Sequence, residues 1–146
     1  MAEWQEPVFD RTQADVDYAR KQLENKANDV DYKGCFNRND LLRIERNTLY
    51  LEEVLTNLYY ITRVNRGAMP ASNGIIYKSS IDRIINNVNI LWEAYHKPAN
   101  AVALPNTLLT FSHVNALEKN HFLINETIEN MVGSFKECNT FSCGEE

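Results

Sequence analysis

The stretch LLRIERNTLYL, residues 41–51, decides the fold because it carries a helical apolar pattern and then recurs. Its leucines and isoleucine return at intervals that place them on one face of an α-helix. Similar stretches follow as SIDRIINNVNIL, residues 80–91, and HVNALEKNHFLI, residues 113–124. Each contains an asparagine three places after an Ile or Leu, and these asparagines are Asn47, Asn87 and Asn120.

Superposing the three stretches gives an internal repeat. Its offsets are 40 and 33 residues, so the units are too irregular for a strict solenoid. Duplication followed by divergence into a bundle explains the repeat, although amphipathic helices of any bundle share similar spacing. The repeat-motif residues are Asp40, Ile44, Glu45, Asn47, Ile84, Asn87, Leu117, Glu118 and Asn120.

Composition favours helices. The chain has 146 residues, enough for a single domain with its own core. Only 5 glycines and 4 prolines are present, which leaves little material for the many tight turns of an all-β protein. We therefore predict an all-α fold of four main helices in an irregular bundle with a threefold internal helix repeat.

Apolar periodicity and breakers place the helices along the chain. Asp10 or Thr12 can cap the first helix, and Asn37 or Asn39 the second. The single domain spans 1–146, with an N-terminal arm over 1–11 and a C-terminal tail over 134–146. The predicted helices cover residues 12–27 and 38–63, then run from Tyr77 until Pro98, and from Val114 to a stop at Gly133.

Charge and hydropathy exclude several classes of function. The formal net charge is −5 without a basic stripe, so nucleic-acid binding is not expected. No run of 18 apolar residues and no apolar N-terminal leader occurs, so the sequence predicts a protein made and kept soluble in the cytosol. Cys35, Cys138 and Cys143 are an odd number of thiols, which we expect to be reduced, although Cys138 and Cys143 could pair on oxidation.

The recurring asparagine calls for a physical reason. Asparagine costs about half a kcal/mol relative to alanine inside a helix. Its carboxamide can donate two hydrogen bonds and accept two, which suits it to tie a helix to the backbone of a neighbouring segment. A ligand-binding role is the second interpretation, but an amide is neither an acid, a base nor a nucleophile.

Two stretches, PVFDRTQADVDYARKQL (residues 7–23) and KGCFNRNDLLRIERNTLYLEEVL (residues 33–55), resemble a helical module in structural proteins of tailed phages and prophages of Firmicutes. That module pairs Asp-x-Thr with Gly-x-Leu-Asn-x-x-Asp-Leu-x-Arg-Ile-Glu-x-Asn-x-x-Tyr-Leu. Phe36 replaces the usual Leu, and residues 109–124 resemble the pattern a second time. The matching residues are Asp10, Thr12, Asp15, Val16, Gly34, Asn37, Asp40, Leu41, Arg43, Ile44, Glu45, Asn47, Tyr50 and Leu51.

The resemblance implies a non-enzymatic component of a virion, associated with the tail or baseplate and made in the host bacterial cytoplasm. Its expected partners are other virion proteins and further copies of itself, with no cofactor. A host-surface module that binds carbohydrate is a third alternative. The interface candidates are Trp4, Phe9, Tyr59, Tyr60, Trp92 and Tyr95. The tyrosines and Trp92 can instead belong to the core, and Trp4 and Phe9 can instead staple the subunit's own bundle.

A di-metal carboxylate bundle is the competing enzymatic hypothesis. Such sites use a Glu-x-x-His motif on each of two helices, and the chain has Glu93–His96 and Glu118–His121. Antiparallel helices could bring the two motifs to one level. Against this, His96 precedes Pro98, where a helix frays, and both glutamates flank the apolar stripes as solvated side chains usually do. No serine or cysteine nucleophile motif and no phosphate-binding loop is present.

Overall fold

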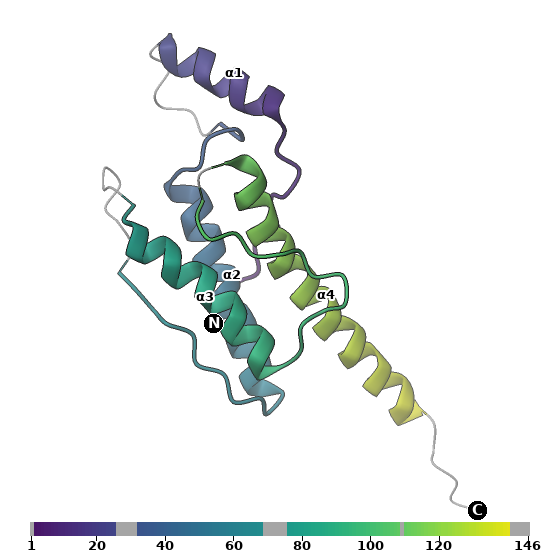
Figure 1. Ribbon diagram of the computed structural model, residues 1–146. Coiled ribbons are helices and arrows are strands. Elements are labelled where there is room, and N and C mark those ends of the chain that lie inside the picture. Colours follow the sequence, from purple (N-terminus) through teal and green to yellow (C-terminus); the bar gives the residue numbers. More distant parts are fainter. Residues whose placement is uncertain (1, 26–31, 69–75, 109, 141–146) are drawn as a thin grey trace, which may run out of the picture.

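Four helices make up the regular structure in the computed structural model, which describes residues 2–25, 32–68, 76–108 and 110–140 (Figure 1). These ranges contain no strand, so the all-α prediction is confirmed. The first three helices begin within one residue of their predicted starts. The helices are α1 (Gln13–Glu24), α2 (Arg38–Asn57), α3 (Lys78–Ala94) and α4 (Phe111–Thr140).

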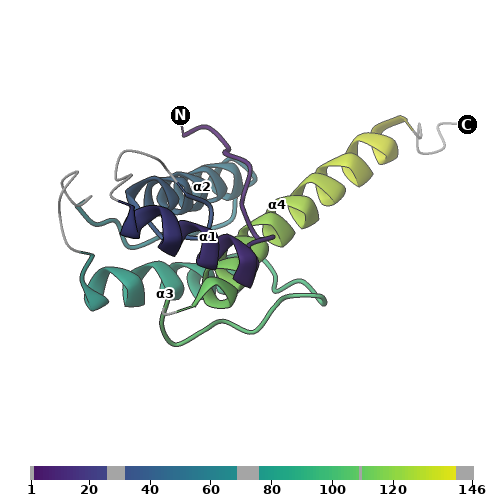
Figure 2. The same cartoon turned by 90° about the horizontal axis from the view of Figure 1, so that it is seen from above.

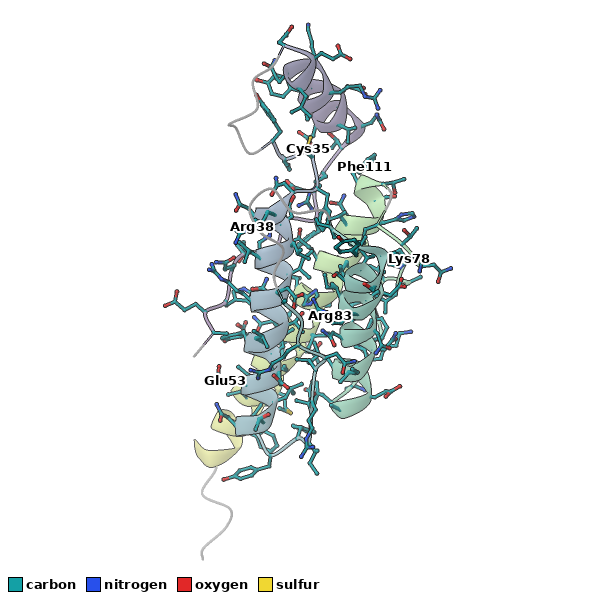
Figure 3. The ribbon with its side chains drawn as sticks, turned by 90° about the vertical axis from the view of Figure 1, so that its left-hand side faces the viewer. Cys35, Arg38, Glu53, Lys78, Arg83 and Phe111 are labelled. Carbon is teal, nitrogen blue, oxygen red and sulfur yellow. The ribbon has the colours of Figure 1, made fainter. Side chains whose placement is uncertain are left out.

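The helices α2, α3 and α4 lie side by side and run in the same direction. Arg38, Lys78 and Phe111, at their N-terminal ends, lie at one end of the bundle, whereas Glu53 lies toward the other (Figure 3). Parallel neighbours need long return connections, and 20 residues separate α2 from α3 while 16 separate α3 from α4. The described parts of these connections, residues 58–68 and 95–108, run back along the bundle without helix or strand (Figure 1). The arrangement therefore differs from up-and-down bundles, in which short loops join antiparallel helices.

The core forms along the seam between these three helices. Buried side chains recur at alternating intervals of three and four residues on α3 and α4, as a shared apolar face requires. Each large side chain buried in this way contributes about 1.5–3 kcal/mol relative to an exposed position. The fully buried members are Leu41, Ile44, Leu51, Leu55, Ile84, Val88, Leu91, Val114, Leu117, Ile124 and Ile128.

The helix α1 lies beyond the N-terminal end of the three-helix bundle (Figures 1 and 2). It begins at a capping box in which the Thr12 hydroxyl accepts from the Asp15 amide and the Asp15 carboxylate accepts from the Thr12 amide. Its first turn rests on Gly34, where an added Cβ would lie 2.1 Å from the carbonyl oxygen of Asp15. Gly34 is therefore required by the close approach of two backbones.

The helix α2 ends earlier than the predicted residue 63. The Tyr60 amide donates to the Leu55 carbonyl at 2.9 Å and the Tyr59 amide to the Thr56 carbonyl at 3.0 Å, a Schellman-type ending. Tyr59 has a φ of 67°, the left-handed conformation that this ending demands. Ile61 continues the apolar spacing of α2 in the sequence, but it lies outside the helix and is 88% exposed. The helix predicted from apolar periodicity was too long, because no glycine in the sequence marks the turn that ends α2.

Replacing Tyr59 with glycine is expected to stabilise the protein by up to about 1 kcal/mol. A left-handed L-residue costs roughly 1–2 kcal/mol, and the greater freedom of glycine in the unfolded chain offsets about half of the relief. No packing within the subunit is lost, because Tyr59 is 95% exposed. Urea denaturation of the two proteins at a concentration low enough to keep them monomeric measures the difference, and a clear loss of stability in Tyr59→Gly there would contradict this account.

The helix α4 does not stop at Gly133, as the sequence predicted, but continues to Thr140. Glycine inside a helix costs about 1 kcal/mol relative to alanine without ending the helix. Ser134 donates from its hydroxyl to the carbonyl of Asn130 at 2.9 Å, as a helical residue can. Most of the predicted tail over 134–146 is therefore helical. None of the described helices has the length and apolarity that a bilayer span needs.

Candidate functional site

Asn47, on α2, holds the N-terminal arm to the bundle. Its Oδ1 accepts from the Gln5 amide at 2.8 Å, and its Nδ2 donates to the Gln5 carbonyl at 2.7 Å. A single carboxamide thereby pairs both backbone groups of one residue, as a neighbouring β-strand would do. Asn47 is only 1% exposed and Gln5 is half-buried, so the clamp lies at the edge of the core.

The other two repeated asparagines form the same pair of bonds. Asn87 on α3 accepts from the Asn65 amide at 2.8 Å and donates to its carbonyl at 3.0 Å. Asn120 on α4 accepts from the Val102 amide at 2.9 Å and donates to its carbonyl at 2.8 Å. Both asparagines are at most 1% exposed. We call these two contacts, together with that of Asn47, the three asparagine clamps. Their contacts support the structural interpretation of the asparagines.

Each clamp holds an extended segment against the outer side of the bundle. The arm crosses from α2 to α4, since the Val8 amide donates to Glu118 Oε2 at 2.8 Å. The segment around Asn65 lies between α2 and α3, since the neighbouring Val64 amide donates to Glu52 Oε1 at 3.0 Å. Extended chain beside helices must find partners for its peptide groups, and helix side chains supply them here.

Aromatic side chains add apolar contacts to the clamp on the arm. Trp4 packs on Tyr50 with ring centroids 5.5 Å apart, and Phe9 packs on Phe122 at 5.2 Å. The ammonium of Lys119 lies 4.5 Å from the centroid of the Phe9 ring. Trp4 and Phe9 therefore contact the subunit's own bundle, the second of the two roles considered for them.

A buried ion-pair network joins the arm to α2 and α4. Arg11 contacts Asp40 at 2.7 Å and Glu118 at 3.0 Å, while Arg43 contacts the same Glu118 oxygen at 2.7 Å. The side chains of Arg11 and Glu118 are 2% and 1% exposed. Two guanidinium groups face two carboxylates, so the network is neutral as a whole. Burial of such charges is tolerated only when every charge is paired.

Arg11 has no donor to spare for an outside ligand. Its Nε donates to the Lys33 carbonyl at 3.1 Å, and one terminal nitrogen donates to the carbonyl of Val8. Asn115 binds both backbone groups of Arg11, donating to its carbonyl at 2.9 Å and accepting from its amide at 3.3 Å. Sequence reasoning missed both Arg11 and Asn115. The Asp-x-Thr motif singled out Asp10 and Thr12 but not Arg11, which lies between them.

The predicted solvation of Glu118 is wrong. This side chain flanks the apolar stripe of α4, but Arg11 and Arg43 cover it, and it is almost fully buried. Burial lowers the pKa of Arg43, but hydrogen bonds and charge from Glu118 and Asp40 outweigh that effect and raise the pKa overall. The network therefore consists of permanently charged arginines and their carboxylates.

A second buried pair ties α2 to α3. Arg83 Nη1 lies 3.1 Å from Glu45 Oε2 and 3.0 Å from the Asn65 carbonyl, and its other terminal nitrogen also contacts Glu45. An added Cβ at Gly67 would lie 2.5 Å from Arg83 Nε, so this glycine leaves room for the guanidinium. Arg83 thus connects Glu45 to the segment that the asparagine clamp holds at Asn65.

His121 is buried against α2. Its Nδ1 donates to the Leu117 carbonyl at 3.0 Å, and its Nε2 lies 2.8 Å from the Thr48 hydroxyl oxygen, which also lies 2.9 Å from the Ile44 carbonyl. Burial lowers the pKa of His121, although the Leu117 carbonyl and the charge of Glu118 oppose the shift. The neutral imidazole is therefore the form that the core holds.

This arrangement predicts a loss of stability in mild acid. The unfolded chain takes up a proton at His121 near its ordinary pKa of 6.5, whereas the folded state does so only at lower pH. The unfolded state therefore binds more protons below about pH 6.5, and the free energy of unfolding falls by about 1 kcal/mol between pH 7.5 and 5.5. We expect His121→Leu to lack this component in urea titrations, whereas the exposed His96→Gln retains it. Equal pH dependence in wild type and His121→Leu would show the assignment to be wrong.

The structure does not bring the proposed metal ligands together. Because α3 and α4 are parallel, Glu93 and His96 lie at the C-terminal end of α3, while Glu118 and His121 lie in the first half of α4 (Figure 1). Glu93 and His96 are exposed. Glu118 binds two arginines, and the imidazole of His121 binds Thr48 and a carbonyl. Among the described residues, no group of three or more His, Cys, Asp or Glu could hold a metal ion.

The aromatic interface candidates differ in exposure. Tyr59 is almost fully exposed, but Tyr60 and Tyr95 pack edge to face with centroids 5.0 Å apart and are half-buried. Trp92 is also half-buried, beneath the ammonium of Lys97 at 4.7 Å. Tyr59 alone of these four presents its ring to solvent. Cys35 forms no disulfide with another described residue, and the side chain of Cys138 and all of Cys143 lie outside the described part of the chain.

The polar residues of the phrase that resembles the phage module thus have structural partners. Asn37 caps α2 through the amides of Asn39 and Asp40, while Asp40, Arg43, Glu45 and Asn47 form the ion pairs and the clamp described above. No protein-family model, no curated protein and no solved structure matches the chain.

Proposed function

We propose that the protein is a structural component of a phage particle or a related phage-tail-like assembly, associated with the tail or baseplate. The proposal rests on what the side chains of the phage-like stretch, residues 33–55, do in the structure. Its charged and amide side chains, Asp40, Arg43, Glu45 and Asn47, are occupied in holding the fold together. Residues that stabilise the fold, and do not form a catalytic site, fit a protein that presents a rigid surface to its neighbours.

Exposed apolar side chains support association with other proteins as the role of this protein. Tyr59, Ile61 and Phe135 are 95%, 88% and 63% exposed. Exposed aromatic and aliphatic side chains of this kind are common at interaction sites. The partners in this proposal are other virion proteins and further copies of the chain. The described contacts offer nothing that favours the di-metal or the carbohydrate-binding alternative.

We also propose that the three clamped helices descend from one repeated unit, an extended segment followed by a helix. The ion pairs support this origin. Arg43 lies four residues before Asn47, Arg83 lies four before Asn87, and each pairs with a glutamate two residues before the clamp asparagine of a neighbouring helix. Those glutamates are Glu118 and Glu45. At the third interface, between α4 and α3, the equivalent positions hold Ala116 and Ile85, an apolar pair.

A double-mutant cycle at the third interface tests the repeat. Ala116→Arg and Ile85→Glu should each destabilise, since each introduces an unpaired charge at a partly or fully buried position. If the geometry is repeated, the double variant should recover about 0.5–3 kcal/mol as the coupling energy of a new ion pair. Thermal or urea denaturation of the four proteins gives the coupling. Additive losses would contradict the proposed equivalence.

Mass spectrometry and immunogold labelling of purified particles test the role in the virion. The proposal expects the chain at a fixed stoichiometry in particles and a label confined to the tail or baseplate. Deleting the gene should leave particles with a defective tail. Absence of the chain from intact particles would reject the proposal. Elemental analysis of the purified protein, with wild type beside His121→Leu, would expose a stoichiometric metal and revive the enzymatic alternative.

A further inference from the structure

The helix α4 continues far beyond its two neighbours. Counted from the clamp asparagines, α2 ends 10 residues later, α3 ends 7 later and α4 ends 20 later. The projecting part, residues 133–140, follows Met131 and Val132, which still pack on the bundle, and extends beyond the other helices (Figures 1 and 2); we call it the overhang. A helical segment of this length without tertiary contacts contributes little stability of its own in water.

The apolar seam of the bundle continues onto the overhang. Ile124 and Ile128 are buried, Met131 is half-buried, and Phe135, at the same spacing, is 63% exposed. The stripe that packs inside the bundle thus emerges with no covering helix in the described chain. Such a continuation is the pattern of a helix that packs against a second helix.

Gly133 has no structural reason within the subunit. An added Cβ there would meet nothing within 4 Å. Alanine would favour the helix by about 1 kcal/mol. Gly133 lies two residues from both Met131 and Phe135, and therefore on the side of α4 opposite the apolar stripe.

A matching apolar surface lies at the same end of the bundle. Tyr59 and Ile61 follow α2 and project into solvent, and we call them the terminal patch. The loop that carries them is fixed against α4, because the hydroxyl of Tyr60, between them, lies 3.8 Å from the sulfur of Met131. The left-handed backbone of Tyr59 fixes where the patch begins.

Charges beside the two features are complementary. Arg63, two residues after Ile61, is exposed. Glu126 and Glu129 are exposed on α4 just before the apolar part of the overhang. An overhang laid on a terminal patch would bring acidic groups toward a basic one, and such pairing fixes register and orientation at interfaces.

We propose that two copies associate around a twofold axis, with the overhang of each copy packed on the terminal patch of the other. Both features occur once per chain and at the same end, so one symmetric interface covers both in both copies. The terminal patch remains open to a second copy, because Tyr59 and Ile61 are exposed although Tyr60 between them contacts Met131 of the same subunit. This inference rests on the proposed assembly role and specifies its first step.

Sedimentation velocity on the full chain across a concentration series tests the interface. Wild type should be a dimer, and Ile61→Ser and Phe135→Ser should each weaken it by about tenfold or more in Kd. Tyr18→Ser is the matched control, because Tyr18 is 59% exposed on α1 at the opposite end and should leave Kd unchanged. Circular dichroism melts confirm that each variant is folded. Gly133→Ala should raise the melting temperature and leave the Kd of the dimer unchanged, because Gly133 lies opposite the apolar stripe of α4.

Charge reversal separates this interface from other dimers. Arg63→Glu and Glu129→Arg should each weaken the dimer, more strongly at low salt, and the double variant should restore it. A monomeric wild type, or a dimer unaffected by both Ile61→Ser and Phe135→Ser, would overturn the proposal. A dimer with these sensitivities whose chain is absent from particles would overturn the virion role alone.

Discussion

Replacing Glu118 with alanine is expected to lower the free energy of unfolding by about 3–5 kcal/mol, the cost typical of breaking a buried ion pair from one side. The variant leaves Arg11 and Arg43 charged in a site where the Arg11 side chain is 2% exposed. It also removes the acceptor of the Val8 amide. Because Glu118 connects the arm, α2 and α4, its loss should release the arm as well as weaken the core.

Two controls make that result interpretable. Glu118→Gln keeps the shape and one acceptor oxygen but removes the charge, so an intermediate loss is expected. Lys78→Ala breaks an exposed i,i+4 pair with Asp82, whose side chains are 78% and 46% exposed, and should cost less than about 0.5 kcal/mol. Guanidinium denaturation of all four proteins gives the comparison. A Glu118→Ala loss no larger than that of Lys78→Ala would show that the network is not buried.

Replacing Asn120 with leucine is expected to cost about 2–4 kcal/mol. The side chains have similar volume, but leucine leaves the amide and carbonyl of Val102 facing an apolar group. The two lost hydrogen bonds join a fully buried asparagine to the part-buried backbone of Val102, and the loss of each costs about 1–2 kcal/mol. Asn130→Leu is the matched control, since Asn130 is an exposed asparagine on the same helix and should change stability by at most about 0.5 kcal/mol. Equal effects of the two substitutions in urea titrations would show that Asn120 does not stabilise the protein through the Val102 backbone.

The helices themselves were predictable because apolar periodicity is a local signal. The spacing of Leu41, Ile44, Leu51 and their counterparts located α2, α3 and the start of α4 within a few residues. The recurrence of asparagine also indicated ties to neighbouring backbone, and all three clamps have that form. Caps were found for the same reason, since an oxygen at the first position of a helix serves amides only two or three residues away.

Features that depend on contacts distant in sequence were not predictable in this way. Glu118 looked solvated because its covering group, Arg11, is 107 residues away. The parallel direction of the helices is set by the long connections, and periodicity carries no information about direction. The end of α2 depends on the turn at Tyr59, where an unfavourable residue replaces the usual glycine signal.

Hydrogen exchange of three backbone amides tests the central claim most directly, which is that the asparagine clamps hold the extended segments in place. By NMR, the amides of Gln5, Asn65 and Val102 should all be protected in the wild-type protein, because each donates to a buried asparagine oxygen. Asn47→Leu, Asn87→Leu and Asn120→Leu should each abolish protection at their own partner first, while core amides of α2 exchange with the global stability. Unprotected partner amides in the wild type, or uniform loss in every variant, would contradict the account.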